Sequence, residues 1–212
     1  MTQSLTQAQL VAWLGAFRDA VHEHRAHLTE LDAAIGDADH GTNLTRGMDA
    51  VMALVDSDDV PDTAASLLKA VGMKLVSTVG GASGPLYGTF FLRAAAAAGD
   101  AETLDAEAVL GMLRAGVEGL ASRGKASVGD KTMVDALAPA VQALADAVGR
   151  GDGLPAGLRA AAVAAAEGRE ATTPLEARKG RASYLGERST GHTDPGAASA
   201  TMLVEALADA VA

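Results

Sequence analysis

Cysteine is absent from this sequence of 212 residues, and aromatic residues make up only 3% of it. A chain without cysteine forms no disulfide bonds and offers no thiolate to a metal, which excludes a secreted disulfide scaffold. Runs of Val, Ile, Thr and aromatic residues, which favour strands, are almost missing as well. These absences favour an all-α protein.

Long apolar runs and a targeting signal are also missing. Charges and glycines interrupt the alanine-rich segments before they reach the length of about 20 residues that a membrane span needs. Residues Met1–Ser4 show neither the basic start nor the apolar run of a signal peptide. We therefore expect a cytoplasmic protein without membrane contact.

Positive charge is scarce, since 17 Lys and Arg stand against 27 Asp and Glu and leave a formal net charge of −10. Binding to nucleic acid depends on clustered Lys and Arg, so a chain this acidic is a poor nucleic-acid binder. We expect no nucleic acid among its partners.

Hydrophobic residues make up 49% of the chain, and many of them are alanine, which loses the least on entering a helix. Apolar residues recur at helical spacing from Leu10 to Val21, behind a capping-box pattern of Thr6 and Gln9. The length suits one domain with its own core. We therefore take residues 1–212 as a single all-α domain.

The apolar pattern predicts about eight helices in an antiparallel up-and-down barrel or bundle. They are expected to begin near Thr6, after His40, near residue 62, after the turn at 80–85, near residue 103, near residue 132, at Pro155 and after Asp194. The loops after the first, third, fifth and seventh helices are polar and rich in glycine. Because alternate loops of such a bundle lie at the same end, we expect these four to form one site.

Three aspartates, Asp32, Asp37 and Asp39, crowd the first of these loops. Clustered carboxylates repel one another unless a cation joins them, and their hard oxygens select Mg²⁺ or Ca²⁺. A lone aspartate in a loop is more often a turn former or a helix cap. The density of this cluster at the start of a helix favours metal binding.

Two further loops suit an anion. The turn Gly80–Gly84 opens a helix, so its backbone N–H groups and the helix dipole attract negative charge, although many such turns are only loops. In the next loop, Thr132 either bonds a phosphate or caps a helix, and Met133 faces either an adenine or the core. The nearby P-loop spacing has Ala126 where Ser or Thr should bind Mg²⁺, which excludes a P-loop NTPase.

The last loop gathers positive charge in an otherwise acidic chain, with Arg178, Lys179, Arg181 and Arg188 followed by His192. The guanidinium fork of arginine suits phosphate, whereas a solvated loop with surface ion pairs is the plainer interpretation. Taken together, the four loops predict a Mg-phosphate site for a nucleotide or a polyphosphate.

Four segments of the chain resemble the nucleotide-binding L subunits of dihydroxyacetone kinases. They are residues 32–43, 80–91, 124–133 and 177–196, and the resemblance extends over nearly the whole chain. The last segment reads ARKGRASYLGERSTGHTDPG and is far more specific than a short motif. The resemblance implies an eight-helix antiparallel barrel with the nucleotide in loops at one end.

The resemblance also implies ligands for this site. Two Mg²⁺ ions would be held by Asp32, Asp37 and Asp39, beside a bound ADP that becomes ATP when charged. Arg181 would steady the transferred phosphoryl group as the catalytic residue. The nucleotide-binding residues that we predict are His40, Gly41, Thr42, Asn43, Ala82, Ser83, Gly124, Thr132, Met133, Arg181, Asp194, Pro195 and Gly196.

Partner subunits follow from the same resemblance. In this family a separate K subunit or domain binds dihydroxyacetone covalently through its own histidine, so we expect this chain to act with such a partner. A free-standing L subunit is similar to the phosphotransferase-system type. In that type the bound ADP is recharged in place by a phosphohistidine protein, the M subunit.

Alternative functions stay open at this point. In the first, the chain uses exchangeable ATP in place of a recharged ADP. In the second, its partner presents erythrulose or another short ketose. In the third, the chain is a nucleotide-dependent module that binds a transcription regulator. A purely structural helical bundle is the remaining alternative, and it leaves the four polar loops unexplained.

Overall fold

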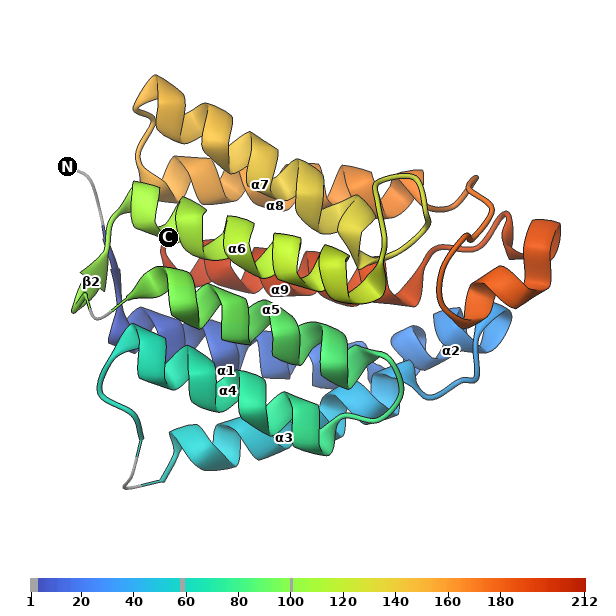
Figure 1. Ribbon diagram of the computed structural model, residues 1–212, viewed down its shortest axis with the longest axis horizontal. Helices are drawn as coiled ribbons and strands as arrows, with labels where there is room; N and C mark the ends of the chain where they lie inside the picture. Colours follow the sequence, from blue (N-terminus) through green and yellow to red (C-terminus); the bar gives the residue numbers. More distant parts are fainter. Residues whose placement is uncertain (1–3, 58–59, 100) are drawn as a thin grey trace.

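The computed structural model describes residues 4–57, 60–99 and 101–212, and α-helices make up most of it (Figure 1). The helices are α1 (Gln7–Glu23), α2 (Arg25–Ile35), α3 (His40–Val55), α4 (Ala64–Thr78), α5 (Ser83–Ala98), α6 (Ala106–Gly124), α7 (Met133–Arg150), α8 (Leu154–Ala171) and α9 (Pro195–Ala210). A 3₁₀ segment, η1 (Arg181–Ser189), and two short strands, β1 (Leu5–Thr6) and β2 (Thr103–Leu104), complete the list. None of the helices in these ranges combines the length and the hydropathy needed to span a lipid bilayer.

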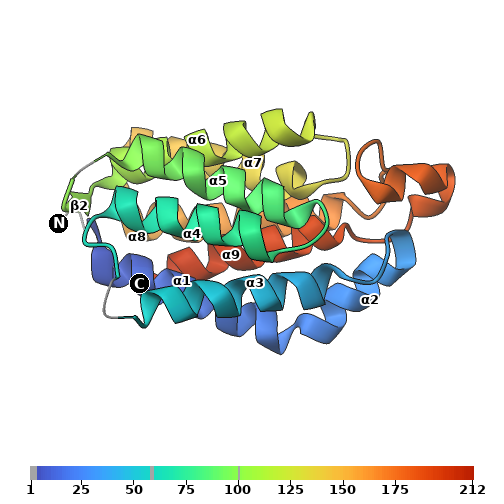
Figure 2. The same cartoon turned by 60° about the horizontal axis from the view of Figure 1, so that its bottom comes forward.

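Eight helices of the described ranges close into a ring. Each helix from α3 to α9 packs against the next one along the chain, α1 packs against α3, and α9 returns to α1. Figures 1 and 2 show these helices running back and forth along the long axis of the molecule. The predicted all-α antiparallel barrel is therefore confirmed.

The additional helix, α2, extends past the end of the barrel. His24 (φ −99°, ψ 12°) interrupts the helical path after α1, and α2 then continues outward beside η1 (Figure 1). The helix packs against α3, α9 and η1. Its last turn therefore carries Asp32 to the rim of the barrel.

Side-chain caps explain where several of the helices begin. Thr6 accepts a hydrogen bond from the N–H of Gln9, and the Gln9 side chain accepts one from the N–H of Thr6, so the predicted capping box is confirmed. Asp194 caps α9 by accepting from the N–H of Ala197, with Pro195 in the first turn, also as predicted.

Two segments depart from the predicted pattern. Thr103 and Leu104 pair as β2 with β1 instead of starting a helix, and α6 begins only after its cap, Asp105. The partner strand lies almost a hundred residues away in the chain, so no local signal indicates this pairing. The polar loop after α8 contains η1, which the sequence did not indicate because it has no apolar periodicity there.

Five of the six aromatic side chains fill the middle of the barrel, and the sixth, Tyr184, is exposed in η1. Trp13, Phe17, Tyr87, Phe90 and Phe91 are at most 1% exposed. The rings of Phe90 and Phe91 meet edge to face with their centroids 5.2 Å apart, a favourable aromatic arrangement. This packed core holds the helices in place, and it thereby sets the positions of the loops at both ends.

Candidate functional site

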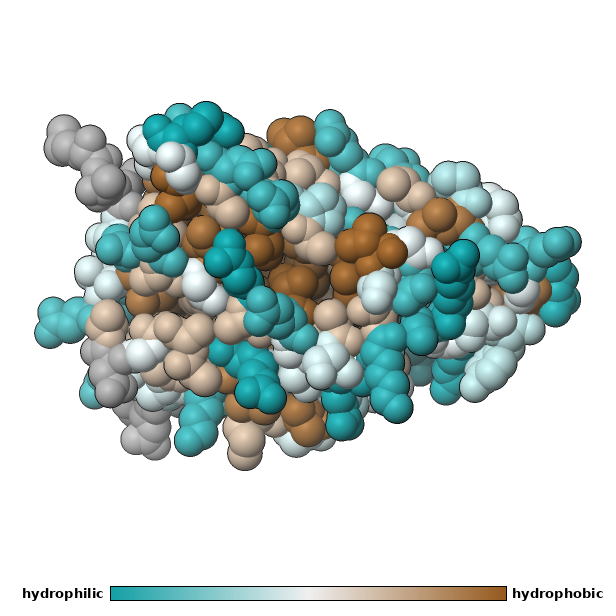
Figure 3. Space-filling view, turned by 45° about the horizontal axis from the view of Figure 1, so that its top comes forward, coloured by the Kyte–Doolittle hydropathy of each residue, from teal (hydrophilic) through white to brown (hydrophobic). Residues whose placement is uncertain are grey.

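The four polar loops meet at one end of the barrel, as the antiparallel path requires. Residues from all four loops surround a cavity of about 330 Å³. Hydrophilic side chains cover most of this end, which carries α2 and η1, whereas apolar side chains reach the surface in the middle of the barrel wall (Figure 3). The expectation that these loops share one end is confirmed.

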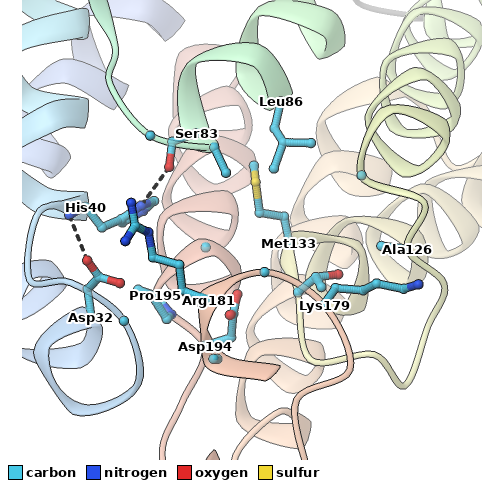
Figure 4. Close-up of a pocket in the computed structure, with 18 of the residues that line it drawn as sticks. Asp32, His40, Ser83, Leu86, Ala126, Met133, Lys179, Arg181, Asp194 and Pro195 are labelled. Carbon is cyan, nitrogen blue, oxygen red and sulfur yellow. Dashed lines mark hydrogen bonds between the residues drawn. The ribbon is translucent and has the colours of Figure 1, made fainter. Parts of the chain in front are cut away.

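Most of the predicted site residues line this cavity (Figure 4). They come from the ends of α2 and α6, from η1, and from the starts of α3, α5, α7 and α9 or the loops just before them. The predicted residues in the cavity wall are Asp32, Asp37, Asp39, His40, Ala82, Ser83, Gly124, Thr132, Met133, Arg181, Asp194, Pro195 and Gly196.

Three predicted nucleotide-binding residues, Gly41, Thr42 and Asn43, lie outside the cavity wall. Gly41 packs α3 against α2, where a Cβ atom would overlap the carbonyl oxygen of Arg25. Thr42 is exposed and accepts a hydrogen bond from the Arg25 guanidinium at 3.4 Å. Asn43 is buried, with its side-chain amide 3.1 Å from the position of a Cβ on Gly80, so it supports the glycine turn from behind. Successive helical residues point in different directions, which is why only His40 of this run faces the cavity.

Asp32, Asp37 and Asp39 form a compact carboxylate cluster, in which one oxygen of each lies within 4.8 Å of the others. The Oδ2 atom of Asp32 accepts hydrogen bonds from the N–H groups of Asp39 (2.8 Å) and His40 (3.1 Å). Ala38 takes a left-handed φ of +61° to make this turn. The arrangement collects three like charges, which a divalent cation would stabilise.

Arg181 lies across the aspartate cluster. Its Nη2 atom is 3.0 Å from Oδ2 of Asp37, and the arginine side chain is 64% exposed. An ion pair this open to water contributes little stability, so the guanidinium can exchange the carboxylate for a phosphate. Among the other basic residues of this loop, Lys179 lines the cavity, while Arg178 and Arg188 are exposed outside it.

His40 is held by hydroxyl groups on both sides of its ring. Nδ1 lies 3.0 Å from Oγ of Ser83, and Nε2 lies 2.9 Å from Oγ of Ser199. The Ser199 hydroxyl also accepts a hydrogen bond from the Tyr87 hydroxyl at 2.7 Å. Burial lowers the pKa of His40, against the opposing effect of the aspartate cluster. The ring therefore bridges the barrel core and the cavity, and it orients the Ser83 hydroxyl.

Asp194 caps α9 within the cavity wall. Burial raises the pKa of its carboxyl group to about 7. The hydrogen bond from the N–H of Ala197 and the positive charge of Lys131 oppose this rise, while the charge of Asp135 adds to it. Asp194 is therefore a carboxyl group whose charge changes near neutral pH.

An apolar wall and a buried lysine were missed by the sequence analysis. Leu86, Leu120 and Val134 line the cavity beside the predicted Met133, and Figure 4 shows Leu86 and Met133 pointing into the same part of it. These residues stand at apolar positions of helices, so no local signal separates them from the core. Lys131 is only 1% exposed and also contributes to the wall.

The cavity therefore has a charged side and an apolar side. The aspartate cluster and Arg181 suit a metal-bound phosphate, while the side chains of Leu86 and Met133 suit a flat organic ring. A nucleotide contains both parts in one molecule.

This chain is similar to known proteins over nearly its whole length. A family model described as the DAK2 domain matches residues 34–209. The chain is 46% identical over 209 residues to the ADP-binding subunit of the PEP-dependent dihydroxyacetone kinase of Escherichia coli strain K12, and 97% of each chain is covered. It is 42% identical over 208 residues to the ADP-binding subunit of the PTS-dependent dihydroxyacetone kinase of Lactococcus lactis, covering 98% of this chain and 100% of that one.

A solved structure is similar along the whole chain. The dihydroxyacetone kinase from C. freundii, in complex with AMP-PNP and Mg²⁺, matches with a TM-score of 0.73 and 28% identity over 99% of this chain. The chain spans 35% of the length of that kinase.

Proposed function

This chain belongs to the DAK2 domain family, and we propose that it is the Mg-nucleotide-binding subunit of a dihydroxyacetone kinase. Residues 1–212 then form one domain that binds ADP or ATP, while a separate K subunit holds dihydroxyacetone. The phosphoryl group passes from the bound nucleotide to the sugar. Two relatives named for ADP binding match over 97% and 100% of their own lengths, which supports this assignment.

The observation that carries the proposal is the meeting of three carboxylates and one guanidinium at a cavity with an apolar wall. Asp32, Asp37 and Asp39 lie within 4.8 Å of one another, and Arg181 lies 3.0 Å from Asp37. Carboxylates alone would repel a phosphate. The three aspartates beside a phosphate-binding arginine are therefore explained if a divalent cation binds to the carboxylates together with the phosphate.

The donor set fits Mg²⁺. The three aspartates offer carboxylate oxygens, and Mg²⁺ is commonly held by a few carboxylates together with substrate phosphates. We propose two Mg²⁺ ions here, which supply charge neutralisation at the phosphates when bound. Asp32 is fixed by the two backbone N–H groups that it accepts from, whereas Asp37 is released for this role when Arg181 turns to the phosphate.

The nucleotide would lie with its phosphates toward the aspartates and its base toward the apolar wall. Ala82 and Ser83 stand at the start of α5, where no side chain caps the helix, so N–H groups are available to the phosphates. Leu86 and Met133 would enclose the base. Asp194, Pro195 and Gly196, at the start of α9, also line the cavity.

Phosphoryl transfer at this site depends on positioning and charge. The bond between the terminal phosphorus and its bridging oxygen breaks, and a bond from the sugar hydroxyl oxygen forms. The hydroxyl proton leaves to a group on the partner subunit. Arg181 balances the negative charge on the transferred group, which makes it the catalytic residue of this chain.

The phosphoryl donor and the partners belong to the same proposal. ADP stays bound and is recharged in place by a phosphohistidine M subunit, a role supported by a relative named as PTS-dependent. Exchangeable ATP, a different short ketose on the partner, and a role in binding a transcription regulator are the alternatives.

Native mass spectrometry of the freshly purified chain, with and without EDTA, tests the proposal. We expect added mass equal to one ADP and two Mg²⁺, which EDTA removes. Asp37→Asn should abolish Mg-dependent nucleotide binding. The matched control is Asp152→Asn, because Asp152 also pairs with an arginine, Arg150, but at the opposite end of the barrel.

The possible outcomes separate the parts of the proposal. A chain that binds neither Mg-ADP nor Mg-ATP would contradict nucleotide binding altogether. Full affinity in Asp37→Asn would contradict the metal assignment. ADP that stays bound through purification favours recharging in place, whereas rapid exchange with free ATP favours the alternative donor.

A further inference from the structure

Lys131 is the most deeply buried charged side chain in the described residues, at 1% exposure. Its Nζ atom donates to four backbone carbonyl oxygens, those of His192 (2.5 Å), Thr172 (2.9 Å), Leu175 (3.0 Å) and Thr173 (3.3 Å). A buried ammonium is costly unless such acceptors surround it. All three protons of the ammonium are therefore engaged by backbone, and none is left for a phosphate.

The four carbonyls belong to two arms of one loop. Thr172, Thr173 and Leu175 lie on the outgoing arm after α8, and His192 lies on the returning arm before α9. The arms also meet directly, since the N–H of Gly191 donates to the Thr173 carbonyl at 2.8 Å. Lys131 thus stands at the base of the loop and holds its two arms together.

Neighbouring contacts tie this base to the loop before α7. The N–H of Arg178 donates to the Asp130 carbonyl at 3.1 Å. The carboxylate of Asp135 accepts from the N–H groups of Gly129 (2.5 Å) and Thr132 (2.7 Å), on either side of Lys131. The backbone of Lys131 takes a left-handed φ of +63°, a strained conformation for a residue with a side chain. The four hydrogen bonds of the ammonium offset this backbone strain.

The loop that Lys131 closes carries the cationic part of the site. Lys179 and Arg181 lie between its arms and line the cavity. At its end, the N–H of Asp194 donates to Oγ1 of Thr172 at 3.0 Å, so the start of α9 is joined to the same base. Movement of the base would therefore shift Arg181 and the start of α9 together.

We propose that Lys131 is a positioning residue, whose ammonium clamps the two arms of residues 172–194 and so places Arg181 over the aspartate cluster. The consequence for activity rests on the proposed function, while the clamp itself does not. A lysine that instead contacted the nucleotide would leave the loop unchanged on neutralisation.

The absence of cysteine from the natural sequence permits a test at the level of one functional group. Lys131→Cys is alkylated in denaturant with 2-bromoethylamine, which restores an ammonium on a side chain of nearly the same length, or with 2-bromoethanol, which gives a neutral hydroxyl. Each product is then refolded. Lys125→Cys, treated identically, is the matched control. Lys125 lies with Lys131 in the loop between α6 and α7, is exposed and also has a left-handed φ of +49°.

Two measurements are made on each product: amide hydrogen exchange of residues 172–194, and affinity for Mg-ADP. The neutral adduct at position 131 should exchange at least about tenfold faster at the N–H groups of Gly191 and Asp194, and should bind Mg-ADP at least about tenfold more weakly. The ammonium adduct should stay within about threefold of the natural chain in both. Both adducts at position 125 should match the natural chain.

Wild-type exchange protection in the neutral adduct would overturn the proposal. Weakened binding with unchanged protection would overturn it as well, since Lys131 would then contact the ligand directly. Failure of the natural chain to bind Mg-ADP would contradict the proposed function. The exchange data would still show whether Lys131 holds the two arms of the loop together.

A second measurement tests the clamp on the natural chain, in case the neutral adduct does not refold. Trace acetylation of the natural chain reports how often Lys131 leaves its carbonyls. If the clamp holds the loop, Lys131 and the N–H of Gly191 should show the same free energy of opening, and Lys125 should react freely. Acetylation of Lys131 while Gly191 stays protected would overturn the proposal.

Discussion

The two ends of the barrel differ in how their helices begin. At the end away from the cavity, Thr6, Thr63 and Asp105 each cap a helix with their own side chain, whereas α8 begins at Gly153 without a side-chain cap. At the cavity end, Thr132 and Asp194 cap α7 and α9, whereas α3 and α5 begin without a cap from their own N-cap side chain. First-turn N–H groups without a side-chain partner are available to an anion.

The uncapped starts at the cavity end serve different purposes. Asp32, from α2, accepts from the N–H groups of Asp39 and His40 at the start of α3, so a carboxylate of the aspartate cluster replaces the missing cap. The start of α5, with Ala82 and Ser83 in the cavity wall, stays open toward the ligand. The difference therefore lies in what an uncapped start faces: α8 begins outside the cavity wall, whereas the uncapped start of α5 lies in that wall and can receive an anion.

Arginine ion pairs at the two ends give the largest expected contrast. Arg181→Met should lower the rate of phosphoryl transfer in the assembled kinase by at least about 100-fold, because the charge on the transferred group loses its partner. Arg150→Met, which removes the exposed pair with Asp152 at the other end, should leave the rate unchanged. Steady-state kinetics with the partner subunits measures both. Equal rates for the two variants would remove Arg181 from the catalytic role.

The Asp194 cap at the cavity end should make stability depend on pH. The folded-state pKa of Asp194 is raised from 3.8 to about 7, so its contribution to stability is complete below pH 4 and is lost as the pH rises toward 7. Asp194→Asn keeps a cap and removes this loss. We expect the variant to gain on the order of 2 to 4 kcal/mol over the natural chain between pH 4 and pH 8, without nucleotide.

Denaturant unfolding at several pH values checks this difference, with Thr63→Asn as the control because Thr63 caps α4 at the other end and has no titratable group. The control should run parallel to the natural chain across the same range. A parallel course for Asp194→Asn as well would show that the cavity wall does not change the ionisation of this carboxyl group.

Threonine caps separate stability from binding. Thr63→Ala and Thr132→Ala each remove a capping box and should each cost about 1 kcal/mol of unfolding free energy. Because Thr132 also lines the cavity, only Thr132→Ala should weaken Mg-ADP binding. Chemical denaturation and calorimetric titration measure the two effects. Weaker binding in Thr63→Ala would mean that the far end is coupled to the site.

Two glycines with similar positive φ angles give the smallest contrast. Gly81 (φ +64°) lies in the cavity wall, and Gly99 (φ +63°) lies at the other end with no atom near the position of a Cβ. Alanine at either position should cost about 1 kcal/mol of stability, because a side chain disfavours this conformation. Gly81→Ala should also weaken Mg-ADP binding by about threefold, since its Cβ would lie 3.8 Å from a carboxylate oxygen of Asp39. An unchanged affinity would show that the glycine turn tolerates the methyl group.

Much of the fold and of the site could be predicted from the sequence, because the signals are local. The helical spacing of apolar residues, the Thr6 capping box and the Asp194 cap each depend on residues a few positions apart. The gathering of the three aspartates was predicted for the same reason, since Asp37 and Asp39 lie in one turn and Asp32 lies in the helix just before it. The order of the helices in an antiparallel barrel then predicted that the four polar loops lie at one end.

Orientation within an element could not be predicted. The run from His40 to Asn43 was assigned to the nucleotide as a unit, yet only His40 faces the cavity. Gly41 and Asn43 face other helices and the glycine turn instead. A helix turns its residues through all directions, and the neighbours that decide which direction is the inside come from elsewhere in the chain.

By itself, then, the sequence determined the all-α class, most of the helix starts, the aspartate cluster and the end of the barrel at which the polar loops meet. Tertiary structure alone decided that Leu86 and Met133 form one apolar wall, and that Lys131 closes a loop from four carbonyls more than forty residues away. The physical reason is range. Caps, periodicity and turns depend on neighbours in the chain, whereas a cavity wall and a buried charge depend on which distant segments pack around them.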